Sequence, residues 1–279
     1  MGRENMDNID VPWDYRKNRI IVDWDNPILA FKANRDRSNG KPQISSPNSE
    51  DALTWNVFRT LQKNNMLGIL RSLFNNSDEI HNPKILLWTL SFSDESNELQ
   101  FEVGDKIRHI DGKHKGQITE PDIVIETNSS LYVVECKLGS PLHPPSHLWD
   151  AGENSGSKKR MNDYFNGDSP FMNGKEVEAL YCGEGYQLFR MAYYAHQLAK
   201  AGKQPYLISI TNEKWWEKKH RNGSSAASIW NEFMGCINKN KTKLLLINVF
   251  WQQIRNAIRR SGENKLEEIL SYLDNHQCL

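Results

Sequence analysis

The chain has 279 residues, and its 35 Lys and Arg are balanced by 35 Asp and Glu, so its formal net charge is zero. This neutrality excludes a protein that coats nucleic acid by bulk positive charge, and any phosphate-binding surface must therefore be local. No apolar run approaches the roughly 20 residues that cross a bilayer, and the first ten residues show no signal-peptide pattern. We expect a cytoplasmic protein with no role in membranes, whose four scattered Cys form neither a zinc site nor a disulfide framework.

Residues 1–48 mix charged residues, Asn and Pro with isolated aromatic residues, and they show no helical stripe. They are expected to form an irregular N-terminal arm, and residues 49–279 are expected to form a single domain. The first helix is predicted to begin at Asn48 or Ser49, either of which can cap free backbone amides, and to run to about Asn64.

The next predicted element is a buried strand over Lys84–Leu90. The charged, Gly-containing stretch 101–120 suits loops and a short hairpin. Two apolar strands follow, over Pro121–Thr127 and Leu131–Lys137, and the polar residues between them indicate a β-hairpin. Residues 139–183 then form a long polar insertion, of a kind that is usually functional or disordered.

The rest of the chain alternates between helical and strand patterns. The predicted elements are a helix from about Gly185 to Gly202, a strand over Gln204–Thr211, a helix over Ala227–Ile237, a strand over Lys243–Phe250 and two C-terminal helical stretches. Taken with the hairpin, this order predicts an α/β sandwich built around a mixed sheet.

The predicted hairpin brings charged side chains together. Side chains alternate between the two faces of a strand, so Glu135 and Lys137 share one face. A turn of two or four residues places Asp122 opposite Glu135, whereas a three-residue loop would place it opposite Cys136. In the first arrangement the two carboxylates stand about 5 Å apart at their roots, and their repulsion requires a positive charge between them.

This arrangement suits a metal ion and hydrolysis. Asp122, Glu135 and the backbone carbonyl of Cys136 offer hard oxygen ligands, which Mg²⁺ prefers, with Mn²⁺ as a substitute. Lys137 on the same face can orient or activate an attacking water and stabilise negative charge on a phosphate. The predicted chemistry is hydrolysis of a phosphodiester bond.

The same residues carry a resemblance to a known superfamily. Pro121-Asp122, followed after twelve residues by Glu135-Cys136-Lys137, resembles the motif of PD-(D/E)XK nucleases, and the element order is similar over Ser49–Thr211. The resemblance implies a restriction-endonuclease-like three-layer core of helix, mixed central sheet and helix, here with a long loop insertion and C-terminal helical additions. It also implies that residues 49–279 form a metal-dependent nuclease domain.

The resemblance further implies roles for single residues. Asp122 and Glu135 would bind the metal ion and Lys137 would be catalytic. Glu50 in the first helix looks like the additional metal-binding carboxylate of the superfamily, with Asp51 as the alternative. For Glu50, a simpler interpretation is that a negative charge stabilises the start of the helix.

Further polar residues are candidates for the site and for DNA contacts. Gln187, together with Arg190, matches the polar residue that the superfamily carries on the helix after the lysine strand, where Gln187 would assist catalysis. Lys and Arg neutralise phosphates, so basic positions are candidates for DNA contact. These candidates are Lys158, Lys159, Arg160, Arg190, Lys218, Lys219 and Arg221.

The sequence thus predicts a Mg²⁺-dependent DNA endonuclease, with a restriction or host-defence role favoured over repair. A restriction enzyme acting alone would form a homodimer to cut both strands, and a cognate methyltransferase would be encoded nearby. The alternative is a module of the same fold that binds nucleic acid or protein and has lost catalysis. For the motif itself, a simpler interpretation is that Asp122 begins a strand and that Glu135 and Lys137 form an exposed rung of an edge strand.

Overall fold

The computed structural model describes most of the chain. The described residues are 20–35, 37–38, 41–42, 44, 46, 49–74, 83–93, 98–100, 102–111, 120–138, 156–199, 202–219, 224–276 and 279.

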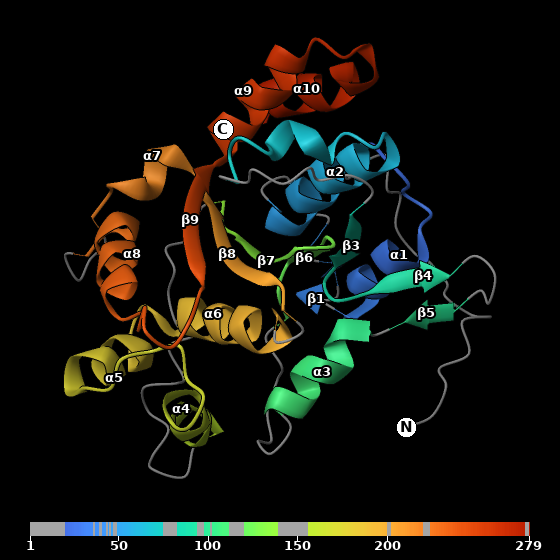
Figure 1. Cartoon of the computed structure of the whole chain (residues 1–279). Coiled ribbons are helices and arrows are strands. Elements are labelled where there is room, and N and C mark those ends of the chain that lie inside the picture. Colours follow the sequence, from blue (N-terminus) through green and yellow to red (C-terminus); the bar gives the residue numbers. More distant parts are fainter. Residues whose placement is uncertain are drawn as a thin grey trace.

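A five-stranded mixed sheet forms the centre of the molecule (Figure 1). Its strands, in spatial order, are β3 (Lys84–Leu87), β6 (Ile123–Glu126), β7 (Ser130–Cys136), β8 (Gln204–Thr211) and β9 (Leu245–Phe250). Strands β3, β6 and β7 are antiparallel neighbours, whereas β7, β8 and β9 run parallel to one another. The carboxyl ends of the three parallel strands therefore share one edge of the sheet, and the expectation of a mixed sheet is confirmed.

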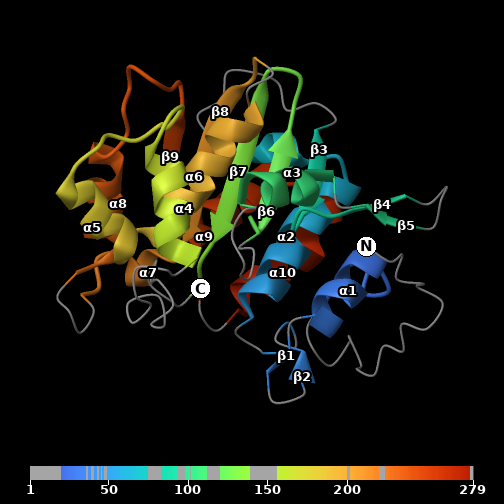
Figure 2. The same cartoon turned by 90° about the horizontal axis from the view of Figure 1, so that it is seen from below.

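Helices cover both faces of the sheet and complete three layers (Figures 1 and 2). The layer on one face contains α2 (Glu50–Lys63), α9 (Trp251–Ser261) and α10 (Glu267–Asp274), and the other contains α6 (Tyr186–Leu198) and α8 (Ala226–Gly235). Alternation along the strands supplies two separate cores. Ile123 and Ile125 of β6 pack into the first core, and Val124 between them packs into the second. The expected core of helix, mixed sheet and helix is confirmed.

Shorter elements surround this core. They are α1 (Pro27–Arg35), β1 (Arg37–Ser38), β2 (Lys41–Pro42), β4 (Ser91–Ser93), β5 (Glu98–Gln100), α3 (Glu102–Asp111), α4 (Gly156–Phe165), α5 (Lys175–Cys182), α7 (Glu213–Trp216) and two 3₁₀ helices, Leu67–Leu70 and Asn264–Leu266.

Four of these helices differ from the sequence-based prediction. Helix α1 lies within the arm that was expected to be irregular, and α3 replaces the loops and hairpin expected over 101–120. Helices α4 and α5 lie inside the expected polar insertion. Their apolar stripes are too short to be clear in the sequence: α3, for example, buries little more than Val103 and Ile107, which are one helical turn apart.

Helix α2 begins where the sequence predicts. The Ser49 side chain accepts a hydrogen bond from the Ala52 backbone N–H at 3.2 Å, so Ser49 rather than Asn48 is the cap. Leu53, Val57 and Leu61 are fully buried against the sheet. This packing fixes the first turn of α2, and with it Glu50, beside the hairpin.

The segment before α1 is attached to α2. The Trp55 indole N–H donates to the Val22 carbonyl at 2.8 Å, and Asp23 forms ion pairs with Arg59 and Lys63. Burial opposes ionisation of Asp23, but the hydrogen bonds from Lys63 and Arg59 outweigh it and lower the pKa of Asp23 below its ordinary value. The ionised Asp23 carboxylate therefore stabilises this attachment.

None of the helices in the described part of the chain is both long and apolar enough to cross a membrane.

Candidate active site

The β6–β7 hairpin has the register that places its two acidic residues together. Ile123 lies opposite Val134, and Glu126 lies opposite Leu131. The turn is closed by a hydrogen bond from the Thr127 N–H to the Ser130 carbonyl at 2.9 Å. One step beyond the paired strands, this register sets Asp122 opposite Glu135, so the pairing predicted for a two- or four-residue turn is confirmed.

Asp122 is fixed at the end of the hairpin by backbone contacts on both sides. Its carboxylate accepts a hydrogen bond from the Cys136 N–H at 2.7 Å, and its carbonyl accepts one from the Trp88 N–H at 2.9 Å. One carboxylate oxygen of Asp122 is therefore held against β7, within the site.

Lys137 joins the carboxylates of two elements. Its ammonium group lies 2.8 Å from one oxygen of Glu135 and 3.0 Å from one oxygen of Glu50. The other Glu50 oxygen accepts a hydrogen bond from the Leu138 N–H at 2.7 Å. Asp51, the alternative to Glu50, instead pairs with Lys32 at 3.3 Å. Of the two helix acids, Glu50 is thus the one that contacts the lysine.

These contacts place Glu50 at the cluster and engage both of its oxygens. One oxygen contacts the Lys137 ammonium and the other accepts from the Leu138 N–H, and each oxygen keeps a second lone pair. Among the described residues, no three His, Cys, Asp or Glu side chains are arranged to hold a metal ion together. In this conformation Glu50 holds the lysine strand in place, and its role as a metal ligand stays a prediction that substitution of Glu50 can test.

The remaining donors still fit Mg²⁺. Glu135 is 2% exposed, and its second oxygen is buried without a hydrogen-bond partner in the described part of the chain. Asp122 stands opposite it, and the Cys136 carbonyl is adjacent. Two carboxylates and a carbonyl, completed by water and phosphate oxygens, are a normal ligand set for Mg²⁺.

Burial and mutual repulsion govern the charges of this cluster. Burial, and then the charge of Glu135, raise the pKa of Asp122 well above its ordinary value, and burial raises the pKa of Glu135 despite the contact with Lys137. Burial alone would lower the pKa of Lys137, but Glu135, Glu50 and Asp122 together outweigh it and raise that pKa well above its ordinary value. One ammonium group thus balances three carboxylates, and a further cation would be stabilised here.

The backbone of Lys137 is also fixed by distant parts of the chain. Its N–H donates to the Ile210 carbonyl of β8 at 2.7 Å, and its carbonyl accepts a hydrogen bond from the Trp251 indole N–H at 3.3 Å. Trp251 is fully buried at the start of α9. No local pattern in the sequence links Trp251 to a lysine 114 residues earlier.

The two candidates on α6 have separate environments. Gln187 is half-buried in the first turn, and its side chain makes no hydrogen bond to the residues that the structure describes. Arg190 is only 1% exposed, and its guanidinium donates to the hydroxyls of Tyr186 and Tyr194 at 3.3 Å and 2.8 Å. The expectation that Arg190 contacts DNA is therefore wrong for this conformation, because its guanidinium is buried and bonded to the two tyrosine hydroxyls.

The basic segment after β8 lies at the same sheet edge as the cluster. Strand β8 runs parallel to β7, so α7 and the exposed Lys218 and Lys219 follow the same carboxyl edge. The Lys218 ammonium lies 3.9 Å from the centre of the Trp215 ring. The remaining DNA-contact candidates have side chains outside the described residues and stay predictions. They are Lys158, Lys159, Arg160 and Arg221.

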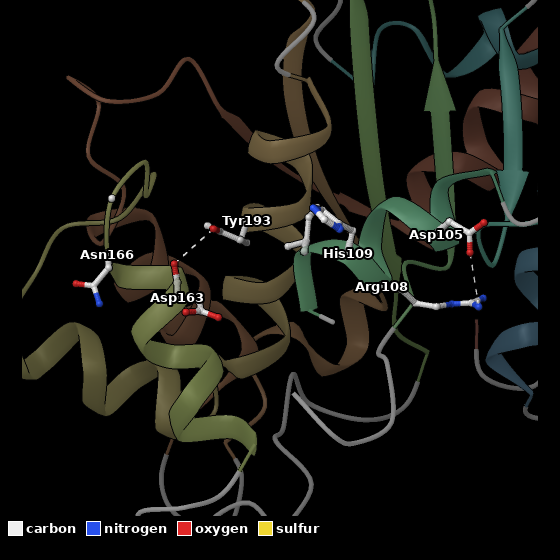
Figure 3. A pocket seen from close by; sticks show the side chains of 8 residues that line it. Asp105, Arg108, His109, Asp163, Asn166 and Tyr193 are labelled. Atoms are coloured by element: carbon white, nitrogen blue, oxygen red, sulfur yellow. Dashed lines mark hydrogen bonds and ion pairs between the residues drawn. The ribbon is translucent and has the colours of Figure 1, made fainter. Parts of the chain in front are cut away.

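A separate hollow of about 770 Å³ lies among α3, α4 and α6 (Figure 3). The Tyr193 hydroxyl donates to the Asp163 carbonyl at 3.4 Å on one side, and Asp105 pairs with Arg108 at 3.7 Å on the other. The acid–acid–lysine cluster contributes no residue to its lining. This hollow is therefore not part of the candidate active site.

The layers, the strand directions and the clustered acids and lysine define a restriction-endonuclease-like α/β protein. Comparison with protein families assigns the chain more narrowly. A family model named REase-ARP, described as "Restriction Endonuclease associating with ARP", matches residues 13–276, and the chain belongs to this family. Comparison with curated proteins and with solved structures finds no match. The suspected relation to restriction-endonuclease-like nucleases is confirmed, and DNA is the substrate class that this family implies.

Proposed function

We propose that the protein is a Mg²⁺-dependent endonuclease that hydrolyses phosphodiester bonds in DNA, with Mn²⁺ as a substitute metal. Asp122, Glu135 and the Cys136 carbonyl would hold the metal ion. The observation that carries the proposal is the position of the Lys137 ammonium, 2.8 Å from a buried Glu135 that faces Asp122 across the hairpin.

The chain's own residues supply the rest of the chemistry. Lys137, paired with two carboxylates, is held as an ammonium group, which donates hydrogen bonds and cannot accept a proton. It therefore orients the attacking water and stabilises the negative charge that develops on the phosphate. A bound Mg²⁺ would polarise the phosphate and make a coordinated water more acidic. Glu50 holds Lys137 and the Leu138 N–H in register for this role.

The biological setting follows from the family. A restriction endonuclease family supports a role in host defence, and the family description names an association with ARP. We extend both to this chain as part of the proposal. A homodimer that cuts both strands and a methyltransferase encoded nearby also belong to it.

The test is cleavage of supercoiled and linear DNA with Mg²⁺, with Mn²⁺ and with a chelator. The wild type should give metal-dependent products, and Glu135→Gln and Lys137→Ala should each cut about a hundredfold more slowly or worse, because each loses charge stabilisation in the transition state. Glu126→Gln is the matched control, because Glu126 pairs with Lys203 at the other end of the same hairpin.

Two results would contradict the proposal. Equal cleavage by the wild type and Lys137→Ala would show that the acid–acid–lysine cluster takes no part in cleavage. Calorimetry that detects no binding of Mn²⁺ by the wild type would instead favour the alternative of a binding module without catalysis.

A further inference from the structure

A polar row crosses the sheet from the candidate active site. Glu135 of β7 pairs with Ser209 of β8, and Ser209 pairs with Asn248 of β9. Paired residues on neighbouring strands point to the same face, so the three side chains form one row. Two residues earlier on each strand, the same face is apolar: it carries Val133 and Leu207, which pack in the core under α6. The row thus interrupts an otherwise apolar surface.

The centre of the row is buried and incompletely bonded. Ser209 has no exposed surface, and its hydroxyl has no hydrogen-bond partner among the described residues. The second carboxylate oxygen of Glu135 is in the same state. A buried polar group without a partner is unfavourable, and nearly all such groups in proteins are bonded to protein or to ordered water. These two groups stand on paired positions, and one ordered water between them would satisfy both.

The geometry allows that contact. Neighbouring strands are about 4.8 Å apart, so a serine hydroxyl and a carboxylate on paired positions can share one water. The other neighbour of Ser209 is Asn248, whose side-chain oxygen accepts a hydrogen bond from Thr211 at 3.2 Å. Asn248 is half-exposed at the edge strand, so water can reach the row from that side.

We propose that Ser209 is a positioning residue for Glu135: its hydroxyl donates to one ordered water, which in turn donates to the second carboxylate oxygen. This inference rests on the proposed metal-dependent function. Lys137 already holds the first oxygen at 2.8 Å. Each carboxylate oxygen has two lone pairs, so these two contacts fix the carboxylate and still leave it able to bind the metal ion opposite Asp122.

The chain offers a matched control in Ser130. It is also fully buried on β7, and its side-chain hydroxyl also lacks a partner in the described part of the chain. It pairs with Gln204 at the opposite end of the strand, five residues and about 17 Å from Glu135. A general effect of removing a buried hydroxyl would appear equally at Ser130 and Ser209, whereas support of the metal site would appear only at Ser209.

The experiment measures Mn²⁺ binding by calorimetry with the full chain. Ser209→Ala and Ser209→Cys, which lack a strong donor, should bind Mn²⁺ about tenfold more weakly than the wild type, as is usual for loss of a partner that orients a metal ligand. Ser209→Thr keeps the hydroxyl and should restore the affinity, and Ser130→Ala should match the wild type. Thermal unfolding without metal verifies that each variant is folded.

The outcomes separate this inference from the proposed function. Wild-type affinity in both Ser209→Ala and Ser209→Cys would overturn the role of Ser209 and leave the proposed metal site standing. An equal loss in Ser209→Ala and Ser130→Ala would overturn it too, because the effect would then be general. An absence of Mn²⁺ binding in the wild type would overturn the proposed metal site and this inference together.

Discussion

Lys137 is held by contacts from four parts of the chain. Glu135 lies two residues away, but Glu50, the Ile210 carbonyl and the Trp251 indole come from other elements. Holding a long side chain in one position costs conformational entropy. Active sites carry this cost where a charged group must have a fixed orientation. The position of the lysine therefore depends on residues that take no part in the reaction.

Replacing Trp251 tests this dependence. Trp251→Phe keeps an aromatic ring in the core but removes the 3.3 Å hydrogen bond to the Lys137 carbonyl. Loss of one such bond corresponds to about 1 kcal/mol, so we expect cleavage at saturating metal to slow about fivefold. The control is Trp230→Phe, a buried tryptophan of α8 in the other core. Equal cleavage rates in the two variants would contradict a positioning role for Trp251.

Glu50 allows a second test at the same scale. Because its oxygens contact Lys137 and the Leu138 N–H, Glu50→Gln should slow cleavage about tenfold or more while leaving Mn²⁺ affinity within about threefold of wild type. Asp122→Asn should abolish Mn²⁺ binding, and Asp51→Asn, which alters a pair with Lys32, should change neither property. Calorimetry combined with cleavage rates measures both. If Glu50→Gln lost Mn²⁺ as completely as Asp122→Asn, Glu50 would be a ligand after all.

Helix α2 connects the candidate site with the N-terminal segment. Its first turn carries Glu50, and its last turns carry Arg59 and Lys63, which pair with Asp23. Asp23 has a φ of 44°, a left-handed conformation that Asp and Asn tolerate better than most residues. Asp23→Asn therefore removes the charge without straining the backbone.

The stability of this attachment should depend on pH. The folded-state pKa of Asp23 is lowered, so its contribution is complete above the unfolded pKa of about 3.9 and is lost as the pH falls through the lower folded-state value. With Arg59 and Lys63 partly exposed, we expect Asp23→Asn to lower the free energy of unfolding by about 1 kcal/mol at pH 7. Urea unfolding from pH 7 downward should show this difference shrink below about pH 4. A difference that stays constant with pH would exclude the charge of Asp23 as its cause.

At the scale of the whole molecule, the zero net charge means that DNA affinity must come from local basic surface. Parallel pairing of β7 and β8 puts Lys218 and Lys219 at the sheet edge that carries the candidate site. The loop before β9 lies at the opposite edge, and it carries the exposed Lys239 and Lys241. The fold thus provides two lysine pairs of similar exposure on opposite sides.

The two pairs give a matched test of where DNA binds. Replacing Lys218 and Lys219 by Ala should weaken DNA binding and reduce the salt dependence of log K by about two, because each phosphate contact contributes roughly 0.9. The same change at Lys239 and Lys241 should leave the slope unaltered. Titrations with DNA at several salt concentrations, with Ca²⁺ in place of Mg²⁺, measure the slope. Equal salt dependences of log K for both double variants would show that DNA does not bind at this edge of the sheet.

The sequence by itself determined the local part of the site. Asp122, Glu135 and Lys137 belong to one hairpin, where alternation and a short turn fix both face and register, and the structure has that register. Helix α2, strand β8 and the mixed sheet were also predictable, because their patterns are long and strongly apolar. Helices α1 and α3 were not, because their short stripes become visible only against the partners that they cover.

Tertiary structure decided which distant residues meet this hairpin. Ser209 lies beside Glu135 only because α6 carries the chain back across the sheet to a parallel strand, and Trp251 meets Lys137 only because α9 packs on the other face. The same packing turned Arg190 into the core and directed both Glu50 oxygens toward the lysine strand. Local periodicity indicates which face of an element is buried, but it does not indicate which other element covers that face. Contacts between residues 70 or more positions apart depend on that covering element.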